Sequence, residues 1–370
     1  MKARLGDVCT VVSGSTPKST VPEYWDGDIK WITPAELSND TYIINDSARH
    51  ITALGVAKTG LKSFPAGTVI LSSRAPIGKT AIAGCEMFCN QGFKNLICSE
   101  KIDSKYLYYF LSGKTDYLNS LGRGATFKEI SKAIVENIEI PLPEVEEQKR
   151  IAARFERLLR LIQLQKAELE ELDKLVKSRF IELFGDPVLN QHGWRKVALE
   201  VNATLLNGRA YKQDELLDSG KYPVLRVGNF FSNRGWYYSD LELDDDKYCD
   251  NGDLLYAWSA SFGPQIWNGG KVIYHYHIWK VLVGEAYNKQ FLCKLLEYAT
   301  ESLMGDTHGI AMMHLTKSGM EKTEFIVPPI ERQEQFAAFV EQTDKSKLAV
   351  QKGLQELEIL KKSLMQQYFG

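Results

Sequence analysis

The sequence predicts an α+β protein formed by tandem duplication, in which a globular domain and a long helix each occur twice. The first observation is an internal repeat: residues 328–370 can be laid over residues 143–185 at a constant offset of 185, with 14 identities and no gap. The second is that good helix formers dominate both segments, which contain no proline beyond their first two residues. The third is that short β-branched and aromatic runs alternate with turn residues elsewhere. A repeat of this length decides the architecture, so the elements follow from it.

The first long helix carries a heptad seam, in which apolar residues recur at alternating steps of four and three. They are Ile151, Phe155, Leu158, Ile162, Leu169, Leu172, Val176 and Leu183, with Gln165 and Arg179 in the two gaps. The second copy is more polar: Phe336, Val340, Val350, Leu354, Leu357 and Leu364 are interrupted by Thr343, Lys347 and Lys361. About 37 residues make a rod of roughly 55 Å. We expect the two rods to pack on each other as an antiparallel coiled coil; the alternative is that they are core helices of an ordinary domain.

The globular parts repeat as well. Residues 67–80 align with 252–265 at the same offset of 185, and upstream the offset becomes 194, so that Gly14 faces Gly208. Expected strands are 69–72, 254–257, 272–274 and 278–283, and expected helices are 104–111 and 289–303. A proline-marked strand then leads into each long helix. The predicted domains are 1–142 and 186–327, mostly antiparallel α+β, followed by helical segments 143–185 and 328–370.

Length and composition narrow the class of protein. A chain of 370 residues with 44% hydrophobic and 25% charged residues predicts two or three globular domains. It has no apolar run long enough to span a membrane and no apolar signal region, so a cytoplasmic location is expected. Six cysteines in a long chain do not indicate a disulfide framework. The net charge is −2; residues 1–142 carry 16 Lys and Arg against 14 Asp and Glu, and residues 186–327 carry 14 against 18. A DNA interface would therefore need local positive charge, or charge from a partner.

The sequence lacks the motifs of common catalytic sites. Gly78-Lys79-Thr80 resembles the end of a phosphate-binding loop, but Ser73 stands where that motif needs glycine. The acidic run 244–246 is better explained as a solvated loop, and His275 with His277 has no third metal ligand in sight. We therefore expect no catalytic residue, no metal and no cofactor.

The remaining polar loops are candidates for contact with DNA. Glycine lets a backbone approach phosphates closely, and Arg, Asn and Gln read base edges. For each residue the competing explanation is an ordinary polar turn, but the same loop positions recur in both halves with different side chains, as two readers of different targets would require. The candidates in the first half are Lys18, Ser73, Arg74, Lys79, Asn90, Gln91, Arg123, Thr126 and Lys128. Those in the second half are Arg209, Lys212, Ser259, Ser261, His275, His277, His308 and His314.

The whole chain resembles the specificity (S) subunit of type I restriction–modification systems. The resemblance lies in the opening LGDVCTVVSGSTPK, the segment G-x-T-F-K-E-I, the Pro-x-x-Glu-x-Gln start of each long helix, and the order domain–helix–domain–helix. It implies that each globular part is a target recognition domain for one half of an interrupted double-stranded DNA sequence. It also implies that the helices hold the domains apart and dock two methyltransferase (M) subunits, and that restriction (R) subunits join to cleave. The second copy departs in having Ile310-Ala311 where Ala125-Thr126 stand in the first, which affects individual DNA contacts.

Two other functions stay open at this point. A coiled-coil scaffold that joins proteins without reading DNA would bind DNA neither specifically nor in a salt-sensitive way. An enzyme of unknown class would show a perturbed carboxylate or histidine cluster in a deep pocket.

Overall fold

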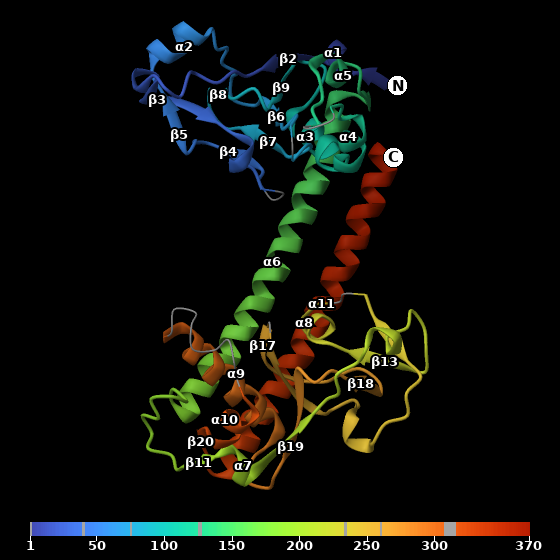
Figure 1. The fold of residues 1–370 in the computed structure, drawn as a ribbon. Helices are drawn as coiled ribbons and strands as arrows, with labels where there is room; N and C mark the ends of the chain where they lie inside the picture. Colours follow the sequence, from blue (N-terminus) through green and yellow to red (C-terminus); the bar gives the residue numbers. More distant parts are fainter. Residues whose placement is uncertain are drawn as a thin grey trace. The chain divides into compact units, whose positions relative to one another are not determined.

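The chain divides into two compact units, the first built from two stretches of sequence and the second from one (Figure 1). The computed structural model describes residues 2–38, 41–74, 76–124, 128–232, 235–259, 261–306 and 316–370, with the backbone alone for 302–306. The first unit comprises Met1–Lys166 and Lys352–Gly370, and the second comprises Ala167–Gln351. Each unit therefore holds one globular part together with half of each long helix. The four-segment division made from the sequence stays a prediction.

Among the described residues, the globular part of the first unit contains two main sheets and one two-stranded pair. The larger has the order β2 (Cys9–Ser13), β9 (Lys94–Cys98), β6 (Val69–Leu71), β7 (Thr80–Ala83) and β4 (Ile43–Ile44). The smaller has the order β5 (Arg49–Ile51), β3 (Trp25–Ile32) and β8 (Phe88–Cys89). Strand β6 is fully buried because Val69 and Leu71 face the core that includes helix α3 (Ser104–Ser112), while Ile70 faces a second core on the other side. This explains its unbroken apolar sequence.

The second unit repeats the core of this topology: among the described residues its larger sheet lacks a counterpart of β4, and its smaller sheet has one extra strand, β15 (Tyr248–Cys249). Its sheets have the orders β12 (Ala203–Asn207), β19 (Ile278–Val283), β16 (Leu254–Ser259), β17 (Ser261–Ile266), and β14 (Tyr237–Ser239), β13 (Tyr222–Leu225), β18 (Val272–Tyr274), β15. Helix α9 (Lys289–Asp306) packs against β17. The register is also repeated: Cys9 pairs with Cys98 in β2·β9, and Ala203 pairs with Val283 in β12·β19, which reproduces the offsets of 194 and 185. The duplication predicted from the sequence is confirmed.

Short elements complete each globular part. Strand β1 (Lys2–Arg4) pairs with β10 (Glu139–Pro141), and β11 (Lys196–Ala198) pairs with β20 (Glu324–Ile326). The short helices are α1 (Leu5–Val8), α2 (Ala53–Thr59), α4 (Thr115–Leu121), α5 (Lys132–Glu136), α7 (Leu199–Asn202), α8 (Val227–Phe231) and α10 (Lys317–Lys322), with single 3-10 turns at Pro22–Tyr24, Pro34–Glu36, Gln213–Glu215 and Asp245–Lys247. Most pairings are antiparallel, as predicted; β3·β8, β13·β18 and β4·β7 are parallel.

The long helices are α6 (Val145–Phe184) and α11 (Ile330–Phe369), each of 40 residues. Gly185 follows α6 with a φ of 75°, a left-handed conformation that ends a helix readily when the residue is glycine. Every predicted seam position of α6 is buried or half-buried. At its C-terminal end, however, the deepest side chains are Phe180 and Phe184, both 0% exposed, whereas the predicted Leu183 is half-buried.

Within each unit the two helices run antiparallel (Figure 1). In the first unit the rings of Phe155 and Phe369 stack with centroids 5.8 Å apart, and Gln165 lies against Gly353 further along. In the second unit Lys347 forms a 2.6 Å ion pair with Asp173. The ring of Phe180 packs edge-on against Phe336 at 5.4 Å. The antiparallel packing predicted from the repeat is thus confirmed in both units.

A buried glutamine fixes the start of each long helix to its globular part. Gln148 is 0% exposed; its Oε1 accepts the backbone N–H of Asp103 at 2.9 Å, and its Nε2 donates to the carbonyls of Lys101 at 3.0 Å and Pro143 at 2.8 Å. Gln333 is likewise 0% exposed and repeats these bonds. It accepts from Asn288 at 2.9 Å and donates to Ala286 at 3.0 Å and Pro328 at 2.8 Å. The glutamine of the Pro-x-x-Glu-x-Gln segment is therefore a structural anchor.

Candidate functional site

Three loops of the first unit meet at Ser73. Its backbone N–H donates to the carbonyl of Gly92 at 2.7 Å, and its carbonyl accepts the N–H of Ile130 at 2.9 Å. The loop after β6, the loop between β8 and β9, and the segment that precedes α5 are therefore neighbours. Most of the candidates predicted in the first half lie on these loops. Ser73 itself is 0% exposed, so its side chain organises this surface from inside and does not lie on it.

A carboxylate on these loops holds two cations. The Nε of Arg74 donates to one oxygen of Glu129 at 2.9 Å, and the Nζ of Lys94 donates to the other at 3.1 Å. The Lys94 side chain is only 8% exposed, and that of Arg74 is 44% exposed. Burial alone would raise the pKa of Glu129, but the hydrogen bonds from Lys94 and Arg74 outweigh it and lower that pKa. The three charges leave one net positive charge at the loop tips.

The other candidates of the first unit differ in exposure. Arg123 and Lys128 are exposed, and Arg123 pairs through its backbone with Glu129, so all three lie together. Gln91 is exposed, and its Oε1 accepts the hydroxyl of Thr16. The remaining candidates are placed as follows: Asn90 caps the N–H of Gly92 at 2.9 Å, Lys18 is exposed near Trp25, the Nζ of Lys79 is bonded to the carbonyl of Leu37, and Thr126 lies outside the described residues.

In the second unit Arg209, on the loop after β12, is bonded to the loop between β18 and β19. Its N–H donates to the carbonyl of Tyr274, and its carbonyl accepts the N–H of Tyr276, both at 3.0 Å. The guanidinium is bonded through both terminal nitrogens to Glu215, at 2.7 and 3.0 Å. Hydrogen bonds from Arg209 and from the backbone of Lys212 lower the pKa of Glu215 to about 2. Arg209 therefore stabilises the loop through both of its terminal nitrogens.

An aromatic and imidazole cluster occupies the place of Asn90 and Gln91 in this second unit. The ring centroids of His275 and Tyr276 lie 4.5 Å apart, and those of Tyr276 and His277 lie 3.9 Å apart. Trp258 packs edge-on against His277 at 5.0 Å. Burial, His277 and the charge of Arg226 lower the pKa of His275 to about 4, so its imidazole is neutral near pH 7. Its Nδ1 accepts the backbone N–H of His277 at 3.4 Å, which leaves Nε2 as the donor.

The rest of the second set of candidates is only partly brought together. Ser259 and Ser261 pair directly across the tip of the β16·β17 hairpin, whereas the matching stretch of the first unit is the open loop from Ser72 to Lys79. The expectation of an equivalent loop there is wrong: Ser259 lies in β16 and Ser261–Ile266 form β17. Lys212 is exposed, and its backbone N–H donates to Glu215 at 2.8 Å. His308 and His314 lie outside the described residues.

Two equivalent glycines hold these loops in place. A Cβ atom on Gly14 would lie 2.2 Å from the carbonyl oxygens of Cys89 and Asn90. A Cβ atom on Gly208 would lie 2.4 Å from those of Tyr274 and His275. The glycines that face each other in the repeat therefore have one role, which is to let the strand before each loop approach the loop's backbone.

Several residues of these clusters were not among the predicted candidates. Glu129 and Lys94 in the first unit and Tyr211, Trp258 and Tyr276 in the second belong to them. Trp258 and Tyr276 had a signal, because they align with Ser73 and Gln91 in the repeat. Glu129 had none, since an acidic side chain is not sought on a surface that faces phosphates.

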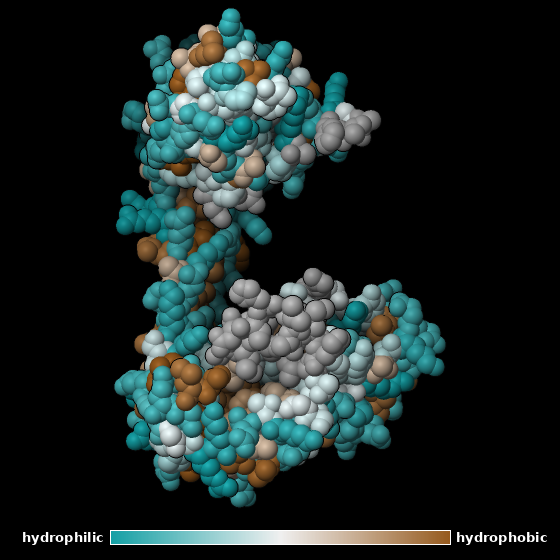
Figure 2. All heavy atoms as spheres, turned by 60° about the vertical axis from the view of Figure 1, so that its left-hand side comes forward, coloured by the Kyte–Doolittle hydropathy of each residue, from teal (hydrophilic) through white to brown (hydrophobic). Residues whose placement is uncertain are grey.

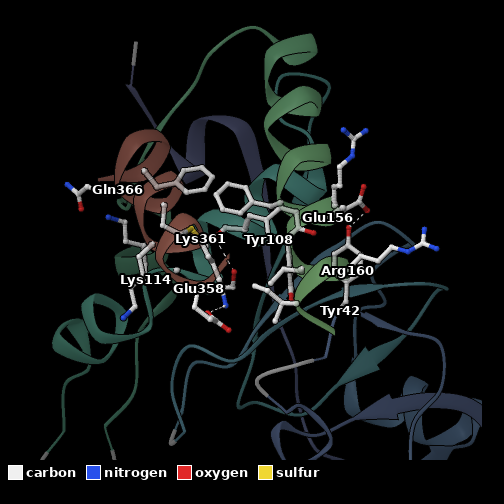
Figure 3. Close-up of a pocket in the computed structure, with 18 of the residues that line it drawn as sticks. Tyr42, Tyr108, Lys114, Glu156, Arg160, Glu358, Lys361 and Gln366 are labelled. Carbon is white, nitrogen blue, oxygen red and sulfur yellow. Dashed lines mark hydrogen bonds and ion pairs between the residues drawn. The ribbon is translucent and has the colours of Figure 1, made fainter. Parts of the chain in front are cut away.

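A separate groove lies in the first unit beside the long helices (Figure 3). It has a volume of about 1170 Å³. Its apolar lining includes Phe155, Met365 and Phe369, and charged side chains of α6 and α11, among them Arg160 and Lys361, surround it. In Figure 3 Glu156 meets Tyr42, whose hydroxyl donates to it at 2.6 Å; Lys105 also donates to Glu156, at 2.7 Å.

Both long helices also expose apolar side chains outside the seam (Figure 2). In the first unit Leu164 is 56% exposed and Ile359 is 67% exposed; in the second, Leu348 is 68% exposed. Within the described residues, no helix is long and apolar enough to cross a membrane. No group of three or more His, Cys, Asp or Glu side chains in that same part of the chain is placed to hold a metal ion.

The protein consists of two similar α+β domains whose loop tips differ, joined through antiparallel helices. These features indicate a class of protein that recognises a target made of two parts. The family model described as "Type I restriction modification DNA specificity domain" matches residues 1–174 and again residues 192–359. The chain therefore belongs to this family.

Individual relatives match this chain over almost its full length. The chain is 29% identical to the type I restriction enzyme MjaIX specificity subunit of Methanocaldococcus jannaschii, covering 98% of this chain and 90% of that one. It is 24% identical to the MjaVIII specificity subunit of the same organism over the same shares. The fold matches the S subunit of a type I restriction–modification system from M. genitalium with a TM-score of 0.60, at 15% identity, over 100% and 96% of the two chains. It also matches a structure reported for complex assembly and conformational transition of the type I R-M system, with a TM-score of 0.64, at 17% identity, over 100% and 97%.

Proposed function

We propose that this chain is the DNA sequence-specificity subunit of a type I restriction–modification enzyme. Each globular part reads one half of a bipartite, gapped target in double-stranded DNA. The long helices set the gap and dock the methyltransferase subunits. The chain itself supplies no catalytic residue, and restriction subunits join the complex for cleavage. We also propose a cytoplasmic location, where such a complex meets DNA.

One observation carries this proposal: the same scaffold occurs twice and presents different chemistry at equivalent tips. Asn90 and Gln91 are replaced by His275 and Tyr276, and Arg74 is replaced by Ser259. The supporting framework keeps the order of its shared strands, its register and its glutamine anchor. A shared scaffold with different loop side chains suits two domains that recognise different short DNA sequences. Base edges are distinguished by the pattern of hydrogen-bond donors and acceptors that contacts them.

The helices suit a role as a fixed spacer. Each has 40 residues, which corresponds to about 60 Å. Because neither contains proline between its first and last turn, each rod is continuous. Two readers on B-DNA that share one face of the duplex have half-sites about 10 bp apart, or roughly 34 Å. The base pairs between the half-sites would not be read.

The groove and the exposed leucines and isoleucine of the helices support partner docking. A methyltransferase subunit that buries an apolar helix face there would cover Leu164 and Ile359 in the first unit and Leu348 in the second. The net charge of the chain is −2, which does not favour binding to the negatively charged DNA backbone. We therefore propose that tight DNA binding requires the methyltransferase subunits, which add positive charge and contact area.

The test is to purify the chain together with its methyltransferase subunits and to sequence the bases that the complex methylates. The expected result is one motif with two short half-sites and a fixed unspecified gap, with no methylation by the chain alone. A scaffold without DNA recognition would give methylation with no gapped motif, and that result would refute the proposal. A mobility-shift series in increasing salt distinguishes binding through phosphate contacts from salt-insensitive adhesion, because phosphate contacts weaken steeply with salt.

A further inference from the structure

Arg74, at the loop tips of the first unit, is held through its Nε by Glu129, and, as far as the described residues go, its terminal nitrogens remain available to bind. On the basis of the proposed function, we propose that Arg74 reads a guanine in the half-site of the first globular part, and that Glu129 and Lys94 act as positioning residues for it.

The guanidinium of Arg74 is bonded on one side only. Its Nε donates to Glu129 at 2.9 Å, and within the described residues this is the only hydrogen bond of the guanidinium. The two terminal nitrogens are therefore left for another acceptor, and the side chain is 44% exposed. Guanine presents O6 and N7 side by side in the major groove, and two parallel N–H groups of one arginine match this pair. No other base presents two adjacent acceptors to that groove.

Arg209 of the second unit provides the contrast. It is also paired with a glutamate and its side chain is 32% exposed, but both terminal nitrogens are bonded to Glu215. To present that pair of terminal nitrogens to a base it would have to break two charge-assisted bonds. Arg209 therefore stabilises its own loop through that pair, whereas the same pair of Arg74 has no partner within the described residues.

Lys94 explains why Glu129 is fixed. Its side chain is 8% exposed, and its Nζ contacts Glu129 at 3.1 Å and the hydroxyl of Ser73 at 3.4 Å. A buried ammonium group is stabilised by a carboxylate beside it, so this ion pair ties Glu129 to the sheet. Glu129 is also held by backbone pairing with Arg123. The rotamer of Arg74 is therefore set before DNA arrives, which lowers the entropy lost on binding.

The experiment measures the methylated motif of complexes that carry Arg74→Lys, Arg74→Ala or Glu129→Gln, on a DNA library with randomised half-sites. Arg74→Lys keeps the charge and the ability to bind a phosphate but cannot make the paired contact. We expect Arg74→Lys and Arg74→Ala to reduce discrimination at one guanine by about 10- to 100-fold and to leave all other positions unchanged. Glu129→Gln should loosen the same position, and less strongly.

Two control variants change basic side chains elsewhere. Lys132→Ala removes an exposed lysine of α5 in the same unit, whose ion-pair partner within the described residues is Glu136, and it should leave the motif as it was. Arg209→Lys should change no guanine preference in the half-site of the first unit. The thermal unfolding of each complex shows whether a variant is folded before its motif is compared.

The outcomes separate the two proposals. If the wild-type complex yields no gapped motif, the proposed function falls. If the gapped motif is present but the Arg74 variants keep every base preference, only the reading role of Arg74 falls. Equal weakening at all sequences by Arg74→Ala, with normal preference in Arg74→Lys, would make Arg74 a phosphate contact and would also overturn the inference.

Discussion

The buried glutamines give the sharpest test of how the helices are attached to the globular parts. Replacing Gln148 by leucine keeps the side-chain size but removes three hydrogen bonds, to Asp103, Lys101 and Pro143. At about 1 kcal/mol net for each bond, the free energy of unfolding of the first unit should fall by about 3 kcal/mol. The groups left without a partner in a buried place push this value upward. Gln333→Leu removes the same three bonds and should cause an equal loss in the second unit.

The assay is urea unfolding of the full-length chain, combined with hydrogen exchange to locate the change. Gln148→Leu should speed exchange in residues 99–106 and leave 284–291 protected, and Gln333→Leu should do the reverse. Gln355→Leu, at an exposed position of α11, is the matched control and should change the free energy of unfolding by less than about 0.5 kcal/mol. If Gln148→Leu proved no more destabilising than this control, the glutamine would not be an anchor and our account of the repeated segment would be wrong.

Three further predictions follow from the helices, the glycines and the histidines. Inserting one heptad at equivalent seam positions of α6 and α11 should lengthen the unread gap in the methylated motif and leave both half-sites as they were; altered half-sites with the old gap would contradict the spacer role. Gly14→Ala places a Cβ 2.2 Å from backbone oxygens and should destabilise the first unit by about 2 kcal/mol or more in urea unfolding, and Gly208→Ala should act likewise on the second unit, whereas Gly235→Ala, in open space, should not. The pKa of His275 is about 4 in the folded protein, below its ordinary value, so its stabilising effect is complete above about pH 6.5 and is lost as the pH falls toward 4. Relative to His275→Asn, the second unit should therefore lose about 1–2 kcal/mol between pH 7 and pH 5, measured by urea unfolding, and a difference that stayed constant with pH would refute this.

The repeat and the heptad spacing allowed much of this fold to be predicted, because both can be seen directly as patterns along the sequence. The bounds of β18 and β19 coincide with the strands expected at 272–274 and 278–283. The offset between Gly14 and Gly208 predicted an equivalence that the packing of their loops explains. The order of strands could not be predicted, since pairing of distant segments such as β3 with β8 leaves no periodic mark in either one.

The candidate site was predicted less well, for physical reasons that differ by residue. Ser73 has a small hydroxyl that suits a surface as well as an interior, so its burial could not be read from its neighbours. Phe180 and Phe184 lie deeper than Leu183 because an α-helix with 3.6 residues per turn drifts from a strict 3.5-residue seam, and large rings of the globular part pack on that side. Arg74 and Arg209 were equal candidates until the structure placed one glutamate beside the Nε of the first and another across both terminal nitrogens of the second.

The central claim is that each globular part reads its own half of the target. The most direct measurement is the methylated motif of a chain in which residues 196–327 are replaced by residues 2–142, so that both tips are those of the first unit. The repeat places these junctions at equivalent points, Lys2 with Lys196 and Leu142 with Val327. The expected result is a gapped motif in which the half-site of the second globular part is gone and that of the first occurs twice. A motif that kept both original half-sites would contradict it.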